Sequence, residues 1–252
     1  MTATFKDHFS TQSDGYAKYR PTYPPELFHY LASLVTGHRS AWDCATGNGQ
    51  VAIALAAHFS EVIATDASQA QIDAAIENPR ISYRRATAER SQLDDSSVDL
   101  VTVGQAFHWF DEQKFGAEAC RVLRPGGVLA IWGYQLCTVN PTCDSIVAHL
   151  YRDIVGDFWP AERTIIEQGY SESEIPGEAL SAPDLRMSAR WHLGDMLGFL
   201  RTWSACERYK AKHGTDPVAA IESDLESAWG DGQRSVNWPM TIKLSRLNTL
   251  LE

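Results

Sequence analysis

The stretch AWDCATGNGQVAIALA, residues 41–56, reads as a short apolar strand, a tight loop of small residues and a helix in direct succession. Gly47 and Gly49 have no Cβ, so this loop can adopt positive φ angles and approach a bulky ligand closely. Asp43 stands at the carboxyl end of the strand, where open parallel sheets bind their ligands. The pattern G-x-G-x-x-A at 47–52 also matches a dinucleotide-binding loop, so the loop indicates a nucleoside cofactor without choosing one.

Composition limits the class of protein. The chain has 252 residues, enough for one α/β domain with a sizeable core. Its 22 basic and 32 acidic residues give a net charge of −10, which disfavours binding to nucleic acids. The five cysteines include no C-x-x-C pair, as expected for reduced thiols in a cytoplasmic protein without a metal site. The longest apolar run, residues 51–57, is too short to span a membrane, so we expect a soluble protein.

Strands and helices alternate along the first half of the chain. Helices are predicted near 25–36, 49–58, 68–77 and 112–123, and strands near 41–44, 61–65, 81–88, 98–105 and 127–134. Repeated strand–helix units of this kind predict an α/β fold with a doubly wound, mostly parallel sheet.

The pattern changes after residue 135. Helical segments are predicted at 143–155, 161–168, 194–211 and 216–229, a loop through 184, and strands at 186–193 and 235–244. The two strands predict an antiparallel edge, and the helices a cap. We therefore expect one domain over 1–252, made of an N-terminal segment with the first helix (1–36), a cofactor-binding core (37–135) and the helical cap with the final two strands (136–252). Tryptophans exposed on the cap would suit a homodimer, and a monomer remains open.

Further candidate ligand contacts follow the other strands. Asp66 lies 23 positions after Asp43, at the end of the second strand, where a carboxylate can accept two hydrogen bonds from ribose hydroxyls. Ala88 and Glu89 follow the third strand and can reach an adenine edge. The segment QAFHW, 105–109, leaves the fourth strand. Because the carboxyl ends of parallel strands meet at one edge of a sheet, we expect all of these residues to face one crevice.

At this point the chain resembles the class I S-adenosylmethionine-dependent methyltransferases, and within them the small-molecule branch of trans-aconitate methyltransferase-like proteins (methyltransferase type 11). The resemblance rests on DCATGNGQ, TDAS, ATAERSQLDDSSVDLV and, most specifically, on the Arg-Pro-Gly-Gly turn in RVLRPGGVLAIW at 121–132. YAKYRPTYP near the start and HWFD at 108–111 are narrower signs of the aconitate-type branch. The resemblance implies a Rossmann-like fold and S-adenosylmethionine as the cofactor.

The resemblance also implies roles for the residues at the strand ends. Asp43 should orient groups near the methionine end of the cofactor, and Gly47 and Gly49 should line the cofactor. Asp66 should hold the ribose. Ala45 stands where the first glycine of the family's loop usually lies, so altered loop geometry or weaker cofactor binding is possible.

Four more residues gain cofactor roles from the resemblance. Ala88 and Glu89 should flank the adenine. The backbone carbonyl of Gln105 should contact the amino group of the cofactor. Arg20 is the candidate partner of its carboxylate, because guanidinium groups pair with carboxylates, and a solvated charge is the alternative for this residue.

The acceptor side has fewer candidates. Tyr16, Tyr19 and Trp109 are the candidate substrate contacts, and the two tyrosines could cover a sulfonium with their ring faces or serve only in packing. His108 is the candidate general base for a hydroxyl or amine acceptor, whereas a carboxylate acceptor needs no base. The alternative roles for His108 are shaping the pocket and capping the following helix.

We therefore expect methyl transfer to a small soluble acceptor, with O-methylation of a carboxylic acid or a related metabolite as the leading function. Arg190 and Arg201 are candidates to bind its negative charge. An NAD-dependent oxidoreductase stays open because of the G-x-G-x-x-A pattern, although the Arg-Pro-Gly-Gly turn and the lack of a Tyr-x-x-x-Lys pattern argue against it. A non-catalytic cofactor-binding protein stays open because of Ala45.

Overall fold

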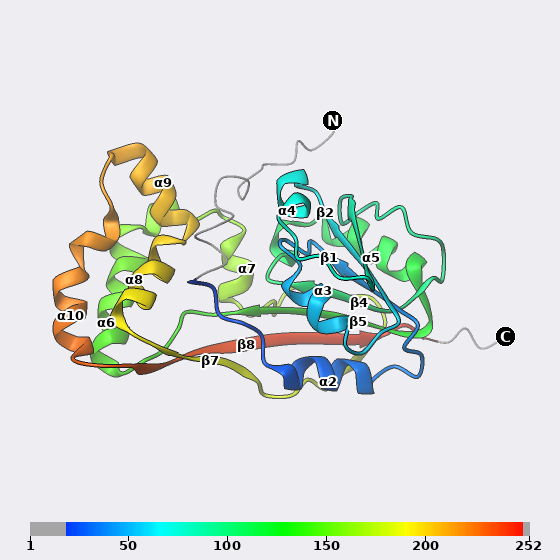
Figure 1. Cartoon of the computed structure of the whole chain (residues 1–252). Coiled ribbons are helices and arrows are strands. Elements are labelled where there is room, and N and C mark those ends of the chain that lie inside the picture. Colours follow the sequence, from blue (N-terminus) through cyan, green and yellow to red (C-terminus); the bar gives the residue numbers. More distant parts are fainter. Residues whose placement is uncertain (1–18, 249–252) are drawn as a thin grey trace.

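A mixed sheet forms the centre of the protein, which is described over residues 19–248 as a computed structural model (Figure 1). The five parallel strands are, in sheet order, β3 (Ile81–Arg85), β2 (Glu61–Asp66), β1 (Ser40–Cys44), β4 (Val98–Gly104) and β5 (Leu123–Tyr134). The long strand β8 (Arg234–Arg246) pairs antiparallel with β5, and β6 (Glu178–Leu180) pairs antiparallel with β8. This order confirms the predicted doubly wound, mostly parallel sheet with an antiparallel edge.

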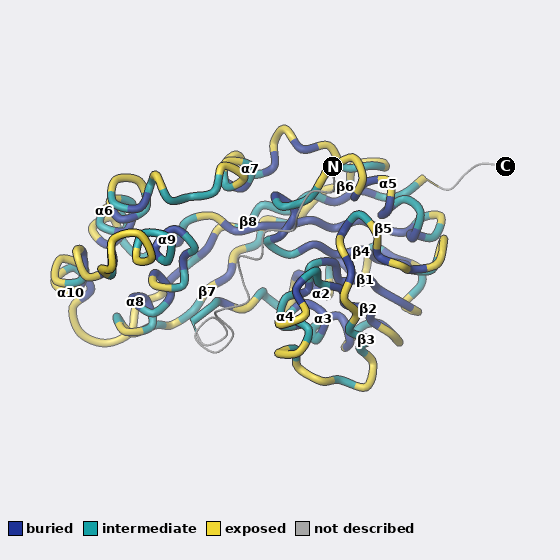
Figure 2. Tube along the Cα trace, turned by 90° about the horizontal axis from the view of Figure 1, so that it is seen from above, coloured by how far each residue is buried: buried dark blue, intermediate teal, exposed yellow. Residues whose placement is uncertain are grey.

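Helices cover both faces of the parallel part. They are α2 (Pro25–Ser33), α3 (Gln50–Leu55), α4 (Gln69–Asp73) and α5 (Glu112–Val122). Because side chains alternate along a strand, Leu100 of β4 packs in the cluster that contains α2 and α3, whereas its neighbour Val101 packs in the cluster that contains α5. Figure 2 shows the resulting buried layer along the central strands.

The second half of the chain forms a helical cap at one end of β8, on the left in Figure 1. Its elements are α6 (Pro141–His149), α8 (Leu193–Arg201), α9 (Ser204–His213), α10 (Glu222–Trp229) and β7 (Arg186–Trp191), which pairs antiparallel with the first half of β8. The short helix α7 (Arg163–Glu167) lies between the cap and the rest of the protein in this view. Four short helical turns are also present in the described residues. They are the 3-10 turns η1 (Phe107–Trp109), η3 (Gly156–Phe158) and η4 (Pro217–Ala220), and the π-helical turn η2 (Leu150–Ile154).

Several predicted segments differ from the structure, among them the helix predicted over 216–229, which is divided into η4 and α10. The helix predicted over 194–211 is divided into α8 and α9, because the chain leaves helical geometry at Trp203, whose backbone is extended. The helix predicted over 143–155 changes to π-helical geometry at residue 150. The loop predicted through 184 contains β6, a third strand in this half, whose three residues are too few to show an alternating pattern.

The tryptophans of the cap are buried or half-buried. Within residues 19–248 the only large apolar side chain classed as exposed is Ile76, at 58%. The rings of the cap pack against one another instead, with Trp191 and Trp238 centroids 4.8 Å apart and Trp159 and Trp203 centroids 5.6 Å apart. The same part of the chain contains no helix that is long and apolar enough to cross a membrane.

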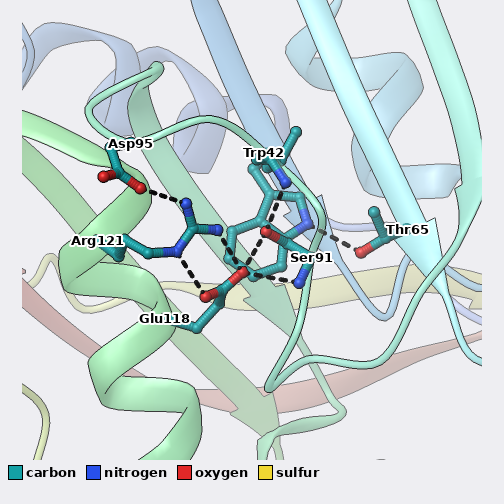
Figure 3. Close-up of polar contacts among 7 residues, drawn as sticks. Trp42, Thr65, Ser91, Asp95, Glu118 and Arg121 are labelled. Atoms are coloured by element: carbon teal, nitrogen blue, oxygen red, sulfur yellow. Dashed lines mark hydrogen bonds and ion pairs between the residues drawn. The ribbon is translucent and has the colours of Figure 1, made fainter.

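A buried carboxylate ties the segment after β3 to α5 (Figure 3). Glu118 Oε1 accepts hydrogen bonds from Ser91 N at 2.8 Å and Ser91 Oγ at 2.5 Å, and Glu118 Oε2 accepts one from Arg121 Nε at 2.9 Å. Arg121 also contacts Asp95 at 2.6 Å. Burial raises the pKa of Glu118, but the hydrogen bonds from Arg121 and Ser91 outweigh it and hold the pKa at about 2. This network fixes the segment that carries Ala88 and Glu89.

Because its pKa in the folded protein lies below the ordinary value of 4.5, Glu118 stabilises the fold above that pH, and the stabilisation is lost as the pH falls from about 4.5 to about 2. We predict that Glu118→Gln lowers the free energy of unfolding at pH 7 by about 1–3 kcal/mol. Between about pH 4.5 and about pH 2, the free energy of unfolding of this variant should also fall less steeply than that of the parent. Urea unfolding at each pH measures both.

Asp94→Asn is the matched control, because Asp94 is an exposed carboxylate in the same segment. The free energy of unfolding of Asp94→Asn should stay within about 0.5 kcal/mol of the parent's at each pH. Equal pH dependence in the parent and in Glu118→Gln would contradict the role assigned to Glu118.

Candidate active site

Asp43 organises the turn after β1. It is 1% exposed, and Thr46 Oγ1 donates to its Oδ2 at 2.5 Å. Thr102 Oγ1 on the adjacent strand β4 donates to its Oδ1 at 2.9 Å. Burial raises the pKa of Asp43 to about 7, although both hydroxyl groups oppose the shift. The carboxyl group therefore joins the turn to β4 inside the protein.

The loop that follows has three residues in left-handed backbone geometry, Ala45 (φ +54°), Gly47 (φ +57°) and Gly49 (φ +88°). A Cβ on Gly49 would lie 2.3 Å from Tyr83 Oη, so packing alone requires glycine at this position. A Cβ on Gly47 would meet only Gln71 Oε1, at 3.7 Å, among the described residues. The space beside Gly47 is therefore the part of the loop that can admit a ligand.

Asp66 stands at the end of β2, directly beside this loop. Its Oδ2 accepts a hydrogen bond from Gly47 N at 2.9 Å, and its Oδ1 accepts one from Ser68 N at 2.8 Å. Two backbone amides thus fix the orientation of the carboxylate. The structure brings the predicted loop and the predicted ribose-binding acid together.

Ala88 and Glu89 lie at the corresponding end of β3. Ala88 is buried in the cluster beneath the site, and Glu89 Oε1 accepts a hydrogen bond from Asp111 N at 3.2 Å, before the start of α5. Burial and the charges of neighbouring carboxylates, Glu89 among them, raise the pKa of the Cys44 thiol. This thiol is therefore protonated and unsuited to act as a nucleophile.

A cleft of about 750 Å³, its open mouth included, lies beyond the ends of β4 and β5. Four of the predicted site residues line it, namely Arg20, Gln105, His108 and Trp109. The remaining walls come from the segment after β5, the segment around α7 and the junction of α8 and α9. The predicted site residues therefore fall into two groups, a glycine loop with its acids after β1 and β2, and a cleft after β4 and β5, and β1 and β4 are neighbours in the sheet.

Arg20 is held at the cap side of the cleft. Its Nη1 donates to Tyr134 Oη at 2.5 Å and its Nη2 to Thr202 O at 3.4 Å. The guanidinium lies over the Phe199 ring, 5.6 Å from its centroid. Arg20 is therefore an ordered, partly buried cation and not the solvated charge of the alternative reading.

The two predicted tyrosines differ in what the structure describes. The Tyr19 ring packs against α8, where a Cβ added to Gly198 would lie 2.6 Å from Tyr19 Cδ1. This contact shows a packing role for Tyr19. Tyr16 lies outside the described residues.

Gln105 lies at the tip of β4 with strained backbone geometry, φ +56°. Its backbone N–H donates to Trp132 O at 2.8 Å, and its side-chain Oε1 accepts from Tyr134 N at 2.7 Å. The side chain is therefore used to join the ends of β4 and β5, which leaves the backbone as the candidate contact to a ligand.

His108 is buried in the wall of the cleft, with 7% exposure, and contacts Trp109 at 4.5 Å between ring centroids. Burial, with a smaller contribution from the charge of Arg163, lowers the pKa of His108 to about 3. The imidazole is therefore neutral at physiological pH and a weak base. It does not cap the next helix, because Asp111 does so by accepting a hydrogen bond from Lys114 N at 3.2 Å.

A second positive charge in the cleft, besides that of Arg20, comes from an arginine that was not predicted from the sequence. Arg163 lines the cleft, whereas Arg190 is exposed on β7 outside it. Arg201 forms ion pairs with Asp216 and Glu222, both at 2.7 Å. Neither Arg190 nor Arg201 therefore serves the cleft.

We predict that Ala45→Gly leaves the free energy of unfolding unchanged or raises it by up to about 1 kcal/mol, because glycine adopts positive φ without strain. Gly49→Ala, which adds a Cβ against Tyr83, should lower it by about 2 kcal/mol or more. Urea unfolding measures both. A large loss of stability in Ala45→Gly, or none in Gly49→Ala, would contradict this loop geometry.

Comparison with known proteins identifies the family. Residues 42–131 match a family model described as a methyltransferase domain. A candidate methyltransferase from Dictyostelium discoideum is 33% identical over 251 residues, which covers 96% of this chain and 95% of the relative. The solved structure of a candidate type II methyltransferase from Anaeromyxobacter dehalogenans is 40% identical, with a TM-score of 0.86, and covers 91% of this chain and 99% of that one. An uncharacterized methyltransferase from Mycobacterium tuberculosis is 36% identical over 137 residues, 52% of this chain and 55% of the relative.

The geometry of the loop fits the cofactor of this family. A fixed carboxylate, Asp66, suits ribose hydroxyls, and the open space beside Gly47 suits the bulk of a nucleoside. These features would suit a nicotinamide cofactor as well, so it is the likeness to methyltransferases along the whole chain that decides against a nicotinamide oxidoreductase. The chain belongs to the class I S-adenosylmethionine-dependent methyltransferases.

Proposed function

We propose that this enzyme transfers a methyl group to a carboxylate oxygen of a small organic acid. The observation that carries the proposal is the charge of the cleft. Its described lining contains two cations, Arg20 and Arg163, a neutral His108, and no aspartate or glutamate. Since the whole chain has a net charge of −10, a cationic cleft is a local feature that favours an anionic acceptor.

The glycine loop is the proposed place of the cofactor. Asp66 would accept hydrogen bonds from the ribose, Gly47 would lie against the nucleoside, and Ala88 and Glu89 would flank the adenine. Asp43 would act indirectly, because its bonds to Thr46 and Thr102 shape the loop.

The methionine end of the cofactor would lie toward the cleft. The backbone carbonyl of Gln105 would bind its amino group and Arg20 its carboxylate, since a guanidinium pairs well with a carboxylate. Ala45 and Gly49 would contribute through the loop backbone. Trp109 would close the side nearest the acceptor, and Tyr19 is a further candidate contact there in addition to its packing against α8.

When bound, S-adenosylmethionine supplies a methyl group that its positive sulfur has already activated for displacement. The enzyme's own residues then have to hold the acceptor oxygen in line and exclude water. A carboxylate is ionised at neutral pH and needs no base, which agrees with a His108 pKa of about 3. Transfer forms a new oxygen–methyl bond, breaks the sulfur–methyl bond and leaves a methyl ester and S-adenosylhomocysteine.

The narrower resemblance supports the same class of acceptor. The segments YAKYRPTYP and HWFD are similar to those of the trans-aconitate methyltransferase-like branch, whose acceptor is a carboxylic acid. In this structure HWFD supplies His108 and Trp109 to the cleft. A small soluble acid, rather than a nucleic acid, is therefore the proposed partner.

We predict that S-adenosylmethionine binds in calorimetric titration, that NAD does not, and that Asp66→Asn weakens S-adenosylmethionine binding at least tenfold, because charge-assisted hydrogen bonds to the ribose are lost. Asp94→Asn, with the same charge change on an exposed segment, should bind like the parent. Equal affinity in Asp66→Asn and the parent would contradict the proposed cofactor site.

We also predict that a panel of small carboxylic acids yields products whose labelled methyl group is released as methanol in alkali, as expected of methyl esters but not of ethers or methylamines. The rate should be nearly constant between pH 6 and 8, because the acceptor is ionised and His108 is neutral throughout. Alkali-stable products, or a rate that rises through this range and becomes flat in His108→Asn, would instead indicate a hydroxyl or amine acceptor with His108 as its base.

A further inference from the structure

Arg163 is a cation of the cleft that forms no ion pair with a described carboxylate. It begins α7, is half-buried and lines the cleft. Among residues 19–248, no aspartate or glutamate oxygen lies within 4.0 Å of its guanidinium, whereas Arg121, Arg124 and Arg201 all have such partners. A partly buried cation of this kind suits a ligand that brings the negative charge.

The guanidinium of Arg163 is held in one orientation. Its Nε donates to Tyr151 Oη at 2.7 Å, and its plane lies over the Trp159 ring, 4.3 Å from the centroid. Trp159 is fixed in turn, because its Nε1 donates to the backbone carbonyl of Tyr151 at 3.0 Å. Tyr151 therefore positions both the cation and the ring that supports it.

Tyr151 can hold this position because its hydroxyl both accepts and donates. It accepts from Arg163 and donates to Glu167. Burial raises the pKa of Tyr151 to about 12, so the hydroxyl keeps its proton for the bond to Glu167. Tyr151 lies in the π-helical turn η2, a geometry that is frequent at functional sites.

The arrangement leaves the terminal nitrogens of Arg163 for a ligand. Its Nε is used by Tyr151 and one face of the group is covered by Trp159, and no described residue accepts a hydrogen bond from its Nη1 or Nη2. These two nitrogens form a planar pair of donors, which matches the two oxygens of a carboxylate.

We propose that Arg163 binds a second carboxylate of the acceptor, one that is not methylated, and that it thereby selects acids with two negative groups over acids with one. The inference rests on the proposed function, and it divides the two arginines of the cleft. Arg20 serves the cofactor and Arg163 serves the acceptor. Tyr151 is a positioning residue, and Trp159 forms the wall beside the anchored carboxylate.

The test compares matched acids of four to six carbons with one or two carboxylates, such as hexanoate and adipate. Binding is measured by calorimetry on the full chain saturated with S-adenosylhomocysteine, and methyl transfer is measured with labelled S-adenosylmethionine. In the parent, we expect the best dicarboxylate to bind at least tenfold more tightly than its monocarboxylate partner. Arg163→Gln should raise Kd and KM for the dicarboxylate about ten- to hundredfold, while its effects on the monocarboxylate and on S-adenosylmethionine stay within about twofold.

Two further variants separate this role from a structural one. Tyr151→Phe keeps the ring but removes the hydroxyl that holds Arg163, so it should raise KM for the dicarboxylate by less than Arg163→Gln does, without weakening cofactor binding. Arg152→Gln removes an exposed positive charge from η2, the turn that also contains Tyr151, and this variant should behave like the parent.

The proposal is overturned if the parent shows no preference for dicarboxylates, if Arg163→Gln affects both kinds of acid equally, or if it weakens S-adenosylmethionine binding as much as Arg20→Gln does. Failure of the proposed function looks different. In that case no acid in the panel yields an alkali-labile methyl product, and the binding arm alone still decides whether Arg163 selects a second carboxylate.

Discussion

The carboxyl group of Asp43 is the contact on which the site depends. It is buried between the hydroxyls of Thr46 and Thr102, so it fixes the backbone that leaves β1 against the neighbouring strand β4. The left-handed turns at Ala45, Gly47 and Gly49 follow from that path, and the amide of Gly47 reaches Asp66 on the next strand. A buried acid with a raised pKa costs stability at neutral pH, and the same group gives the loop its shape.

The second constraint is the long strand β8, which belongs both to the main sheet and to the cap. The first half of β8 pairs with β7 and its second half pairs with β5, so β8 places the cap beside the ends of β4 and β5. The cleft forms between the cap and these strand ends. The loop side supplies the carboxylate of Asp66. The cleft side supplies Arg20, whose guanidinium donates to Thr202 O, and Arg163 at the start of α7. The loop therefore carries negative charge and the cleft carries positive charge.

Much of this could be predicted from local sequence signals. The glycine loop, Asp66 and the five parallel strands have short, strong patterns, because a buried strand and a tight turn each constrain adjacent residues. The sequence could not reveal Arg163, because its role depends on Tyr151 and Trp159, which meet it only through tertiary packing. It also could not reveal which cap tryptophans contact one another, since the partner of a buried ring depends on tertiary packing. Gly49 was assigned to the cofactor from its type, yet the structure shows that Tyr83 already requires it.

A crystal structure of the enzyme with S-adenosylhomocysteine tests the central claim, that the loop and the cleft are two halves of one site. The account predicts that the ribose lies on Asp66, that the nucleoside lies beside Gly47, and that the sulfur opens into the cleft lined by His108 and Arg163. A sulfur that points away from this cleft, or an adenosine lodged between Trp159 and Trp203, would contradict it.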